Sequence, residues 1–195
     1  MATTLTVPKS PRKLMSDEEY IAFLEGRPDE ERWELIDGEA IMMNPPKLRH
    51  QRIGGNLAWE LNAHFRQQKA ELIALQEIGL HIPGVRRFRP KPDVAVIDDQ
   101  VDLDTSWADR FFLVAEVLSD SNTAKQIERK RRRYIEHPLN LQVLVIAQRE
   151  LRVEFWSRRT GWQPTVLTQP DDILELPEFG LALAVSSFYA GARVA

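Results

Sequence analysis

The stretch Phe111-Phe112-Leu113-Val114-Ala115-Glu116-Val117-Leu118 decides how the rest of the chain is interpreted. Both of its alternating sets of positions are apolar, a pattern typical of a central strand covered on both faces of a sheet. One carboxylate, Glu116, interrupts the pattern, on the face that alternation assigns to Phe112 and Val114. An ionised carboxylate there is costly unless it is paired or binds a metal. The plainer alternative is an end-of-strand glutamate that reaches solvent or pairs with an arginine.

A second acid stands at the start of the preceding apolar strand. Asp93 follows Pro92 and opens the run Val94 to Ile97, one connection before the strand that carries Glu116. Carboxylates on neighbouring strands can meet and offer the oxygen ligands that hard divalent cations prefer. The pattern therefore indicates a candidate metal site, and a simple strand-entry aspartate is the alternative.

A basic helix is predicted directly after this strand, from Thr123 to His137. Between Lys125 and Arg133 it carries six basic residues and one acid, which is most often a solvated charged face. Helical periodicity places Lys130 at the edge of the apolar arc and Arg131 within it. A lysine beside two carboxylates and a metal suits phosphodiester hydrolysis, because the metal activates water and the ammonium stabilises developing charge.

The remaining pattern predicts one α/β domain over residues 16–195, after a disordered lead-in over residues 1–15. Ser16 and Glu19 form a capping box, and Asp37-Gly38 between two apolar runs is a strong hairpin signal. The other predicted elements are a short helix from Ser16 to Gly26, a hairpin at 32–44, a helix at 48–68, a strand at 72–82 and a C-terminal meander with strands at 141–147, 151–157 and 162–167.

Composition excludes several classes of protein. The chain has 195 residues, 43% of them hydrophobic and 28% charged, as in ordinary globular proteins. It has no cysteine, which excludes a disulfide framework and a thiol nucleophile and fits a cytoplasmic location. A net charge of −3 argues against a globally basic nucleic-acid binder but leaves room for a local basic patch. No apolar run approaches the roughly 20 residues of a membrane helix, so no membrane is expected as a partner.

Six short stretches together resemble the PD-(D/E)xK nuclease superfamily and, more narrowly, the Uma family of restriction-endonuclease-type proteins. Each match is weak alone, but their common order along nearly the whole chain is specific. The matching stretches are Met15–Tyr20, Trp33–Glu39, Met43–His50 with Ile53, Pro92–Val96, Val114–Ser119, and Lys130 with Tyr134.

The resemblance implies a restriction-endonuclease-like fold, in which a mixed sheet is flanked by helices, with an N-terminal hairpin and a C-terminal β-meander. It also implies hydrolysis of DNA phosphodiester bonds that depends on Mg²⁺ or Mn²⁺. Asp93 and Glu116 would be metal ligands and catalytic residues, with the Val117 carbonyl as a backbone ligand. Glu34 would be an additional acid, acting in catalysis and at the metal.

Two positions depart from the superfamily pattern. The lysine expected two residues after the glutamate is replaced by Leu118, and the Uma pattern instead puts a lysine on the next helix, which matches Lys130. Gln126 stands where relatives often have an acid, so that support for Lys130 is missing. Either Lys130 or Arg131 could therefore be the catalytic cation.

Basic residues near these motifs predict a DNA-contacting surface, although scattered surface charge is an equal alternative. The candidate nucleic-acid contacts are His50, which matches a family position, and Arg49, Arg89, Arg132 and Arg133.

We also expect a homodimer, because cutting both strands with one site per chain usually takes two copies related by a two-fold axis. The aromatic-rich segment 151–167 is the predicted contact. Two other functions stay open: a catalytically idle nuclease-fold module that binds DNA or a protein, and a nuclease that acts on RNA.

Overall fold

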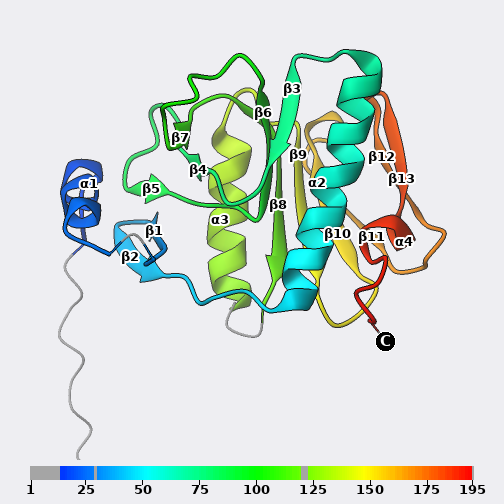
Figure 1. The fold of residues 1–195 in the computed structure, drawn as a ribbon, viewed down its shortest axis with the longest axis horizontal. Coiled ribbons are helices and arrows are strands. Elements are labelled where there is room, and N and C mark those ends of the chain that lie inside the picture. The colour runs from blue at the N-terminus through cyan, green and yellow to red at the C-terminus, as the bar shows by residue number, and fades with distance from the viewer. Residues whose placement is uncertain (1–13, 29, 120–122, 195) are drawn as a thin grey trace, which may run out of the picture.

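The structure is a computed structural model, and it describes residues 14–28, 30–119 and 123–194. Runs of strands are separated by the helices along the chain (Figure 1). In order they are α1 (Asp17–Glu25), β1 (Trp33–Ile36), β2 (Glu39–Met42), α2 (Leu48–Gln68), β3 (Leu72–Leu75), β4 (Gly79–Leu80), β5 (Phe88–Arg89), β6 (Val94–Asp98), β7 (Trp107–Ala108), β8 (Phe111–Leu118), α3 (Ala124–Glu136), β9 (Gln142–Ala147), β10 (Val153–Ser157), the 3₁₀ turn η1 (Arg158–Thr160), β11 (Pro164–Leu167), β12 (Ile173–Leu176), the 3₁₀ turn η2 (Pro177–Phe179), β13 (Leu181–Ala184) and α4 (Val185–Phe188).

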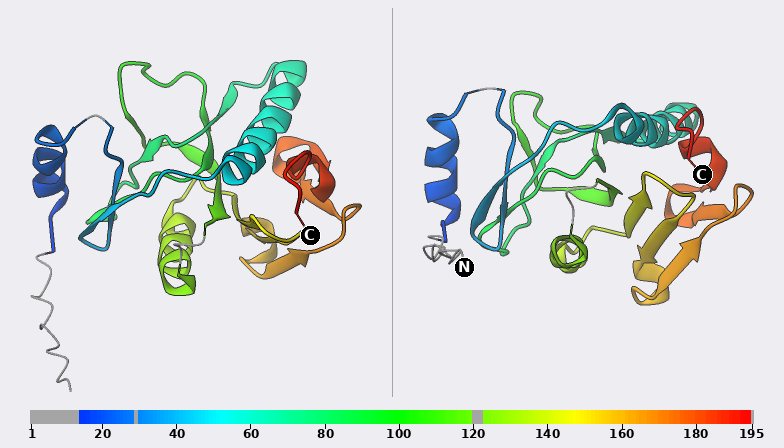
Figure 2. Two further views of the ribbon diagram at one scale, coloured as in Figure 1. Left: turned by 60° about the horizontal axis from the view of Figure 1, so that its bottom comes forward. Right: turned by 90° about the horizontal axis from the view of Figure 1, so that it is seen from below.

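A six-stranded mixed sheet organises the described residues, with the strand order β11-β10-β9-β8-β6-β3. Strand β8 lies inside it, antiparallel to β6 and parallel to β9. Helices α2 and α3 lie on opposite faces of this sheet (Figure 2). One core joins α2 to β12, β13 and α4, and the other joins α3 to the hairpin sheet β2-β1-β5. Both faces of β8 are therefore covered, as its apolar sequence predicts.

Most predicted elements are confirmed, and so is the predicted restriction-endonuclease-like α/β fold class. Ser16 and Glu19 form the capping box of α1. Asp37 and Gly38 have φ angles of 49° and 87°, which closes the β1–β2 hairpin as an Asp-Gly turn does. Strands β9, β10 and β11 form the predicted antiparallel meander.

The single strand predicted over residues 72–82 is wrong. Strand β3 ends at Leu75 and pairs with β6, whereas β4 pairs with β7 in a separate sheet. Glu77, between them, has a left-handed backbone with φ of 55°, which an extended strand cannot continue through.

Strict alternation along Phe111–Leu118 is also wrong at one point. The register of β8 against β6 shifts so that Leu113 pairs with Val96 but Phe111 pairs with Ile97. This β-bulge leaves Phe112 unpaired and turns it toward the core of α2. Glu116 therefore shares its face with Val114 and Phe111, on the α3 side, and not with Phe112.

Two remaining predictions concern the N-terminal lead-in and membrane-spanning helices. Residues 1–13 of the predicted lead-in lie outside the described residues, and the N–H of Met15 donates to the carbonyl of Gly38. Within residues 14–194, apart from those not described, no helix has the length and apolarity needed to span a bilayer.

The aromatic side chains on which the dimer prediction relied pack inward. Trp156 is buried, with the guanidinium of Arg131 over its ring. Phe155 packs against the α2 core and Trp162 against the α3 core. These residues therefore do not form an exposed aromatic surface.

Candidate active site

The pairing of β6 with β8 brings the two predicted acids together. Val94 lies opposite Ala115, so Asp93 and Glu116 are neighbours at one edge of the sheet. Only 9% of Asp93 and 6% of Glu116 is exposed. The backbone N–H of Val117 donates to Asp93 Oδ2 over 2.6 Å, which holds this carboxylate against β8.

Helix α3 adds a cation and a phenol to the same place. Lys130 is 6% exposed, and its Nζ lies 2.7 Å from Glu116 Oε1. One turn later, the hydroxyl of Tyr134 donates to the same oxygen over 2.6 Å. Because residues four apart share a helix face, one face of α3 holds both groups against Glu116.

The hairpin closes the site from a third direction. Glu34, on β1, is 7% exposed, and its Oε1 accepts from Lys130 Nζ over 2.8 Å. The same oxygen accepts the backbone N–H of Lys91 over 2.7 Å. The ammonium of Lys130 therefore bridges two buried carboxylates that come from elements far apart in sequence.

Burial dominates the electrostatics of this cluster. It raises the pKa of Glu116 to about 7, although Lys130 opposes the shift. Burial alone would lower the pKa of Lys130, but Glu116 and Glu34 outweigh it and hold this pKa above its ordinary value. Glu34 and Glu116 share the single ammonium of Lys130, and the third carboxylate, Asp93, lies beside Glu116, so the cluster favours a further cation.

His50, in the first turn of α2, contacts Asp93. Its Nε2 lies 3.3 Å from Asp93 Oδ2, and the residue is 8% exposed. Burial lowers the pKa of His50, but its contact with Asp93 outweighs this and raises the pKa overall. The imidazole is therefore placed to orient Asp93.

These side chains line a cavity of about 480 Å³. The structure thus brings together Glu34, His50, Asp93, Glu116, Val117 and Lys130, all of which were predicted as site residues. Other residues that line the cavity were not predicted as site residues, among them Arg32 and Gln148. Arg32 forms an ion pair with Glu77. Gln148 directly follows the parallel neighbour of β8, a placement that only the sheet order reveals.

The four arginines predicted to contact DNA lie elsewhere, and none is among the described residues that line this cavity. Each is engaged within the chain: Arg49 donates to the Ala192 carbonyl, Arg89 pairs with Asp17, Arg132 with Glu128, and Arg133 with Asp37 and Glu136. Their contact with DNA stays a prediction.

The placement of Arg131 deeper than Lys130 is wrong. The guanidinium of Arg131 donates to both oxygens of Glu128 and lies 4.9 Å from the ring centre of Trp156. Lys130, and not Arg131, projects into the cavity because the hairpin acid Glu34 and the strand acid Glu116 both face it.

The donor chemistry of the site fits a hard divalent cation. Asp93, Glu116 and the Val117 carbonyl offer oxygen atoms, which Mg²⁺ and Mn²⁺ prefer. Among the described residues, no group of three or more histidine or acidic side chains is already gathered in a metal-binding arrangement. The fit therefore rests on the oxygen donors and on the excess of negative charge.

Comparison with known proteins places this geometry in a family. Residues 17–186 match the model of the Uma2 family, described as "Putative restriction endonuclease". The fold is similar to that in a crystal structure from Anabaena variabilis ATCC 29413, described as a putative nuclease belonging to DUF820. The two share 18% identity and a TM-score of 0.72, over 90% of this chain and 97% of that chain. No curated protein matches. The family model spans most of the chain, and the chain belongs to the Uma2 family.

Proposed function

We propose that this protein is an endonuclease that hydrolyses DNA phosphodiester bonds and depends on Mg²⁺ or Mn²⁺. One observation carries the proposal: the buried ammonium of Lys130 lies between Glu34 and Glu116, beside Asp93, in the wall of a cavity. Buried ion pairs are weak contributors to stability, because desolvation offsets much of their attraction. A charged cluster of this kind therefore favours a chemical role, and membership of a nuclease family supports hydrolysis.

Each side chain has a distinct part in this proposal. Asp93, Glu116 and the Val117 carbonyl hold the metal, and Glu34 is the additional acid. A bound divalent cation lowers the pKa of a water molecule and polarises the phosphate. Lys130 stabilises the negative charge that develops on the phosphate oxygens.

Three neighbours prepare these groups for their task. Glu34 holds the ammonium of Lys130, and Tyr134 holds Glu116. His50, on α2, holds Asp93. Groups that are already oriented need not be ordered on the way to the transition state. The entropic part of the barrier is then smaller, which is why such contacts matter for the rate.

DNA is the proposed partner, with Arg49, Arg89, Arg132 and Arg133 as peripheral phosphate contacts that would exchange their internal partners for DNA. A homodimer remains our proposal for double-strand cutting, since each chain offers one site. A DNA substrate also agrees with the cytoplasmic location predicted from the sequence.

Cleavage of supercoiled plasmid during a Mg²⁺ and Mn²⁺ titration tests the proposal. The wild-type protein should cut only with metal, whereas Glu116→Gln and Asp93→Asn should lose both cleavage and calorimetric Mn²⁺ binding. The matched control is Glu154→Gln, which removes a carboxylate paired with Arg152 on the outer meander and should change neither property. A folded wild-type protein that binds DNA but never cuts it would instead support an idle binding module.

A further inference from the structure

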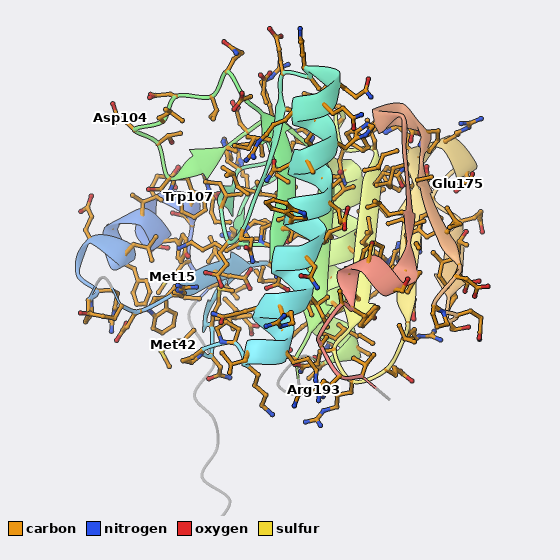
Figure 3. All side chains as sticks on the ribbon, turned by 45° about the vertical axis from the view of Figure 1, so that its right-hand side comes forward. Met15, Met42, Asp104, Trp107, Glu175 and Arg193 are labelled. Atoms are coloured by element: carbon orange, nitrogen blue, oxygen red, sulfur yellow. The ribbon has the colours of Figure 1, made fainter. Side chains whose placement is uncertain are left out.

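A second hollow adjoins the cavity of the candidate active site. The two share Pro46, Lys47 and Gln148, so they are continuous. The second hollow is completed by Leu48, Arg49 and Arg149. It therefore lies where the first turn of α2 meets the turn between β9 and β10, at the lower edge of the molecule in Figure 1. In Figure 3 the first turn of α2 lies between the labelled Met42, on the hairpin, and Arg193, near the C-terminus.

The side chain of Gln148 lies between the two hollows. The residue is only 5% exposed, and no hydrogen bond of its amide is found within the described residues. The buried side-chain atoms there that lack a partner belong to Asn140 and Gln142, so the amide of Gln148 is not sealed away from the hollows. Gln148 lines both hollows, so its amide is available to a ligand that enters between them.

The first turn of α2 supplies a second, independent feature. Helix α2 is 21 residues long, and no side chain caps its N-terminus at Lys47. The first N–H groups of a helix lack partners within it and carry partial positive charge, which suits an anion. Arg49 adds a positive charge at this edge, where its Nε donates to the Ala192 carbonyl over 2.9 Å.

We infer that this hollow is a second phosphate subsite, which binds a phosphate of the DNA strand other than the one that is cleaved. The inference rests on the proposed function, and it adds Gln148 and the first turn of α2 as substrate-binding groups. An amide can donate to a phosphate oxygen without adding charge beside Asp93 and Glu116. The continuity of the two hollows suits neighbouring phosphates of one strand, and the positive helix end favours an anion over a neutral base.

Fluorescence anisotropy with a labelled DNA duplex tests this subsite, with Ca²⁺ in place of Mg²⁺. A set of duplexes carries one uncharged methylphosphonate linkage at a time. For the wild-type protein, we expect about tenfold weaker binding when one linkage beside the cleaved one is neutral, as for the loss of one charge-assisted hydrogen bond. Gln148→Ala should weaken binding of unmodified DNA to a similar degree and should lose sensitivity at that linkage. The matched control is Gln163→Ala, at an exposed position.

A second pair of variants tests the helix end separately. Leu48→Pro removes the first N–H of α2 at a position where proline is well tolerated, whereas Leu48→Ala keeps it. Only Leu48→Pro should weaken binding at the same linkage.

The possible outcomes separate this inference from the proposed function. Cleavage by the wild-type protein with no sensitive neighbouring linkage, or with a sensitivity that survives in Gln148→Ala, overturns the subsite alone. A sensitive linkage that is lost in Gln148→Ala, in a protein that never cuts with Mg²⁺ or Mn²⁺, supports the subsite and overturns the nuclease proposal. Sensitivity to base identity in place of linkage charge overturns the assignment to phosphate.

Discussion

Two clusters of charged side chains join the same hairpin to the same helix, and they differ mainly in burial. In the inner cluster, the side chains of Glu34 and Lys130 are 9% and 8% exposed. In the outer cluster, Asp37 contacts Arg129 and Arg133, and these side chains are between 27% and 36% exposed. Each cluster links strand β1 or its turn to α3.

The outer cluster shows that partly exposed ion pairs are enough to hold the hairpin against α3. Partly exposed ion pairs need little desolvation and contribute modestly, typically less than about 1 kcal/mol. The inner cluster, which also includes Glu116 and Asp93, removes three carboxylates and an ammonium from water. This costs several kcal/mol per ion before the ions pair. Holding β1 against α3 therefore does not by itself explain why the charges of the inner cluster are buried. A chemical role for these side chains does explain it.

The largest effect should follow from removing the inner cation. In Lys130→Ala, Glu34 and Glu116 stay buried with no ammonium between them, so the free energy of unfolding without metal should fall by about 3–5 kcal/mol. Turnover should fall about 100-fold or more, because one electrostatic donor to the transition state is lost. Denaturant unfolding in EDTA and single-turnover plasmid cleavage with Mg²⁺ measure the two effects.

A matched change on the same helix sharpens this result. Arg132→Ala removes a charge whose side chain is 72% exposed and pairs with Glu128. Stability should change by less than about 0.5 kcal/mol, and turnover at saturating DNA should stay near normal. DNA binding should weaken, with a shallower salt dependence. Full cleavage by a folded Lys130→Met protein, which keeps the side-chain volume, would remove Lys130 from the mechanism.

Strand periodicity and turn signals predicted most of the elements and the meeting of Asp93 with Glu116. The restriction-endonuclease-like architecture and the roles of Glu34 and Val117 came instead from the resemblance to a known family. Asp93 and Glu116 stand on strands whose apolar residues are unmistakable, so their pairing could be expected from the sequence. The bulge at Phe112 and the left-handed Glu77 could not, because each is a single-residue change in backbone conformation that the neighbouring residues do not mark.

It was harder to predict which basic side chains point into the cavity than to predict where the acidic side chains lie. Lys130 and Arg131 are adjacent on one helix, and the choice between them depends on Glu34, which lies almost one hundred residues earlier in the chain. Two of the arginines expected to face DNA are engaged by acids far away in the sequence, Arg89 by Asp17 and Arg133 by Asp37. Such long-range partners leave no mark in local sequence patterns.

A smaller effect should follow from removing the phenol that supports Glu116. Tyr134 is fully buried, and its hydroxyl donates to Glu116 Oε1. Tyr134→Phe keeps the ring and removes one hydrogen bond to a charged group, so the free energy of unfolding should fall by about 1.5–3 kcal/mol. Turnover should fall less than in Lys130→Ala, because the ammonium remains. Equal losses of turnover in the two variants would show that holding Glu116 matters more than the cation itself.

A small effect, comparable to that of Arg132→Ala, should come from the outer cluster. Asp37→Asn keeps the turn, because asparagine tolerates the φ of 49° and Asn-Gly suits this type of hairpin. It removes the charge that Arg129 and Arg133 contact, so stability at pH 7 should fall by less than about 1 kcal/mol. Turnover at saturating DNA should be unchanged.

The difference in stability between the wild-type protein and Asp37→Asn should depend on pH. Burial would raise the pKa of Asp37, but hydrogen bonds from Arg129 and Arg133 outweigh it and hold the pKa below its ordinary value. Since the folded pKa is lowered, the wild-type advantage should be complete above the unfolded value of about 3.9 and should vanish as the pH falls through the folded value. Urea unfolding of both proteins at pH 7 and pH 3, with and without 1 M salt, measures this difference, which salt should reduce. A loss of several kcal/mol, or any loss of turnover, would mean that the exposed cluster also supports the site, and the distinction between the two clusters would fail.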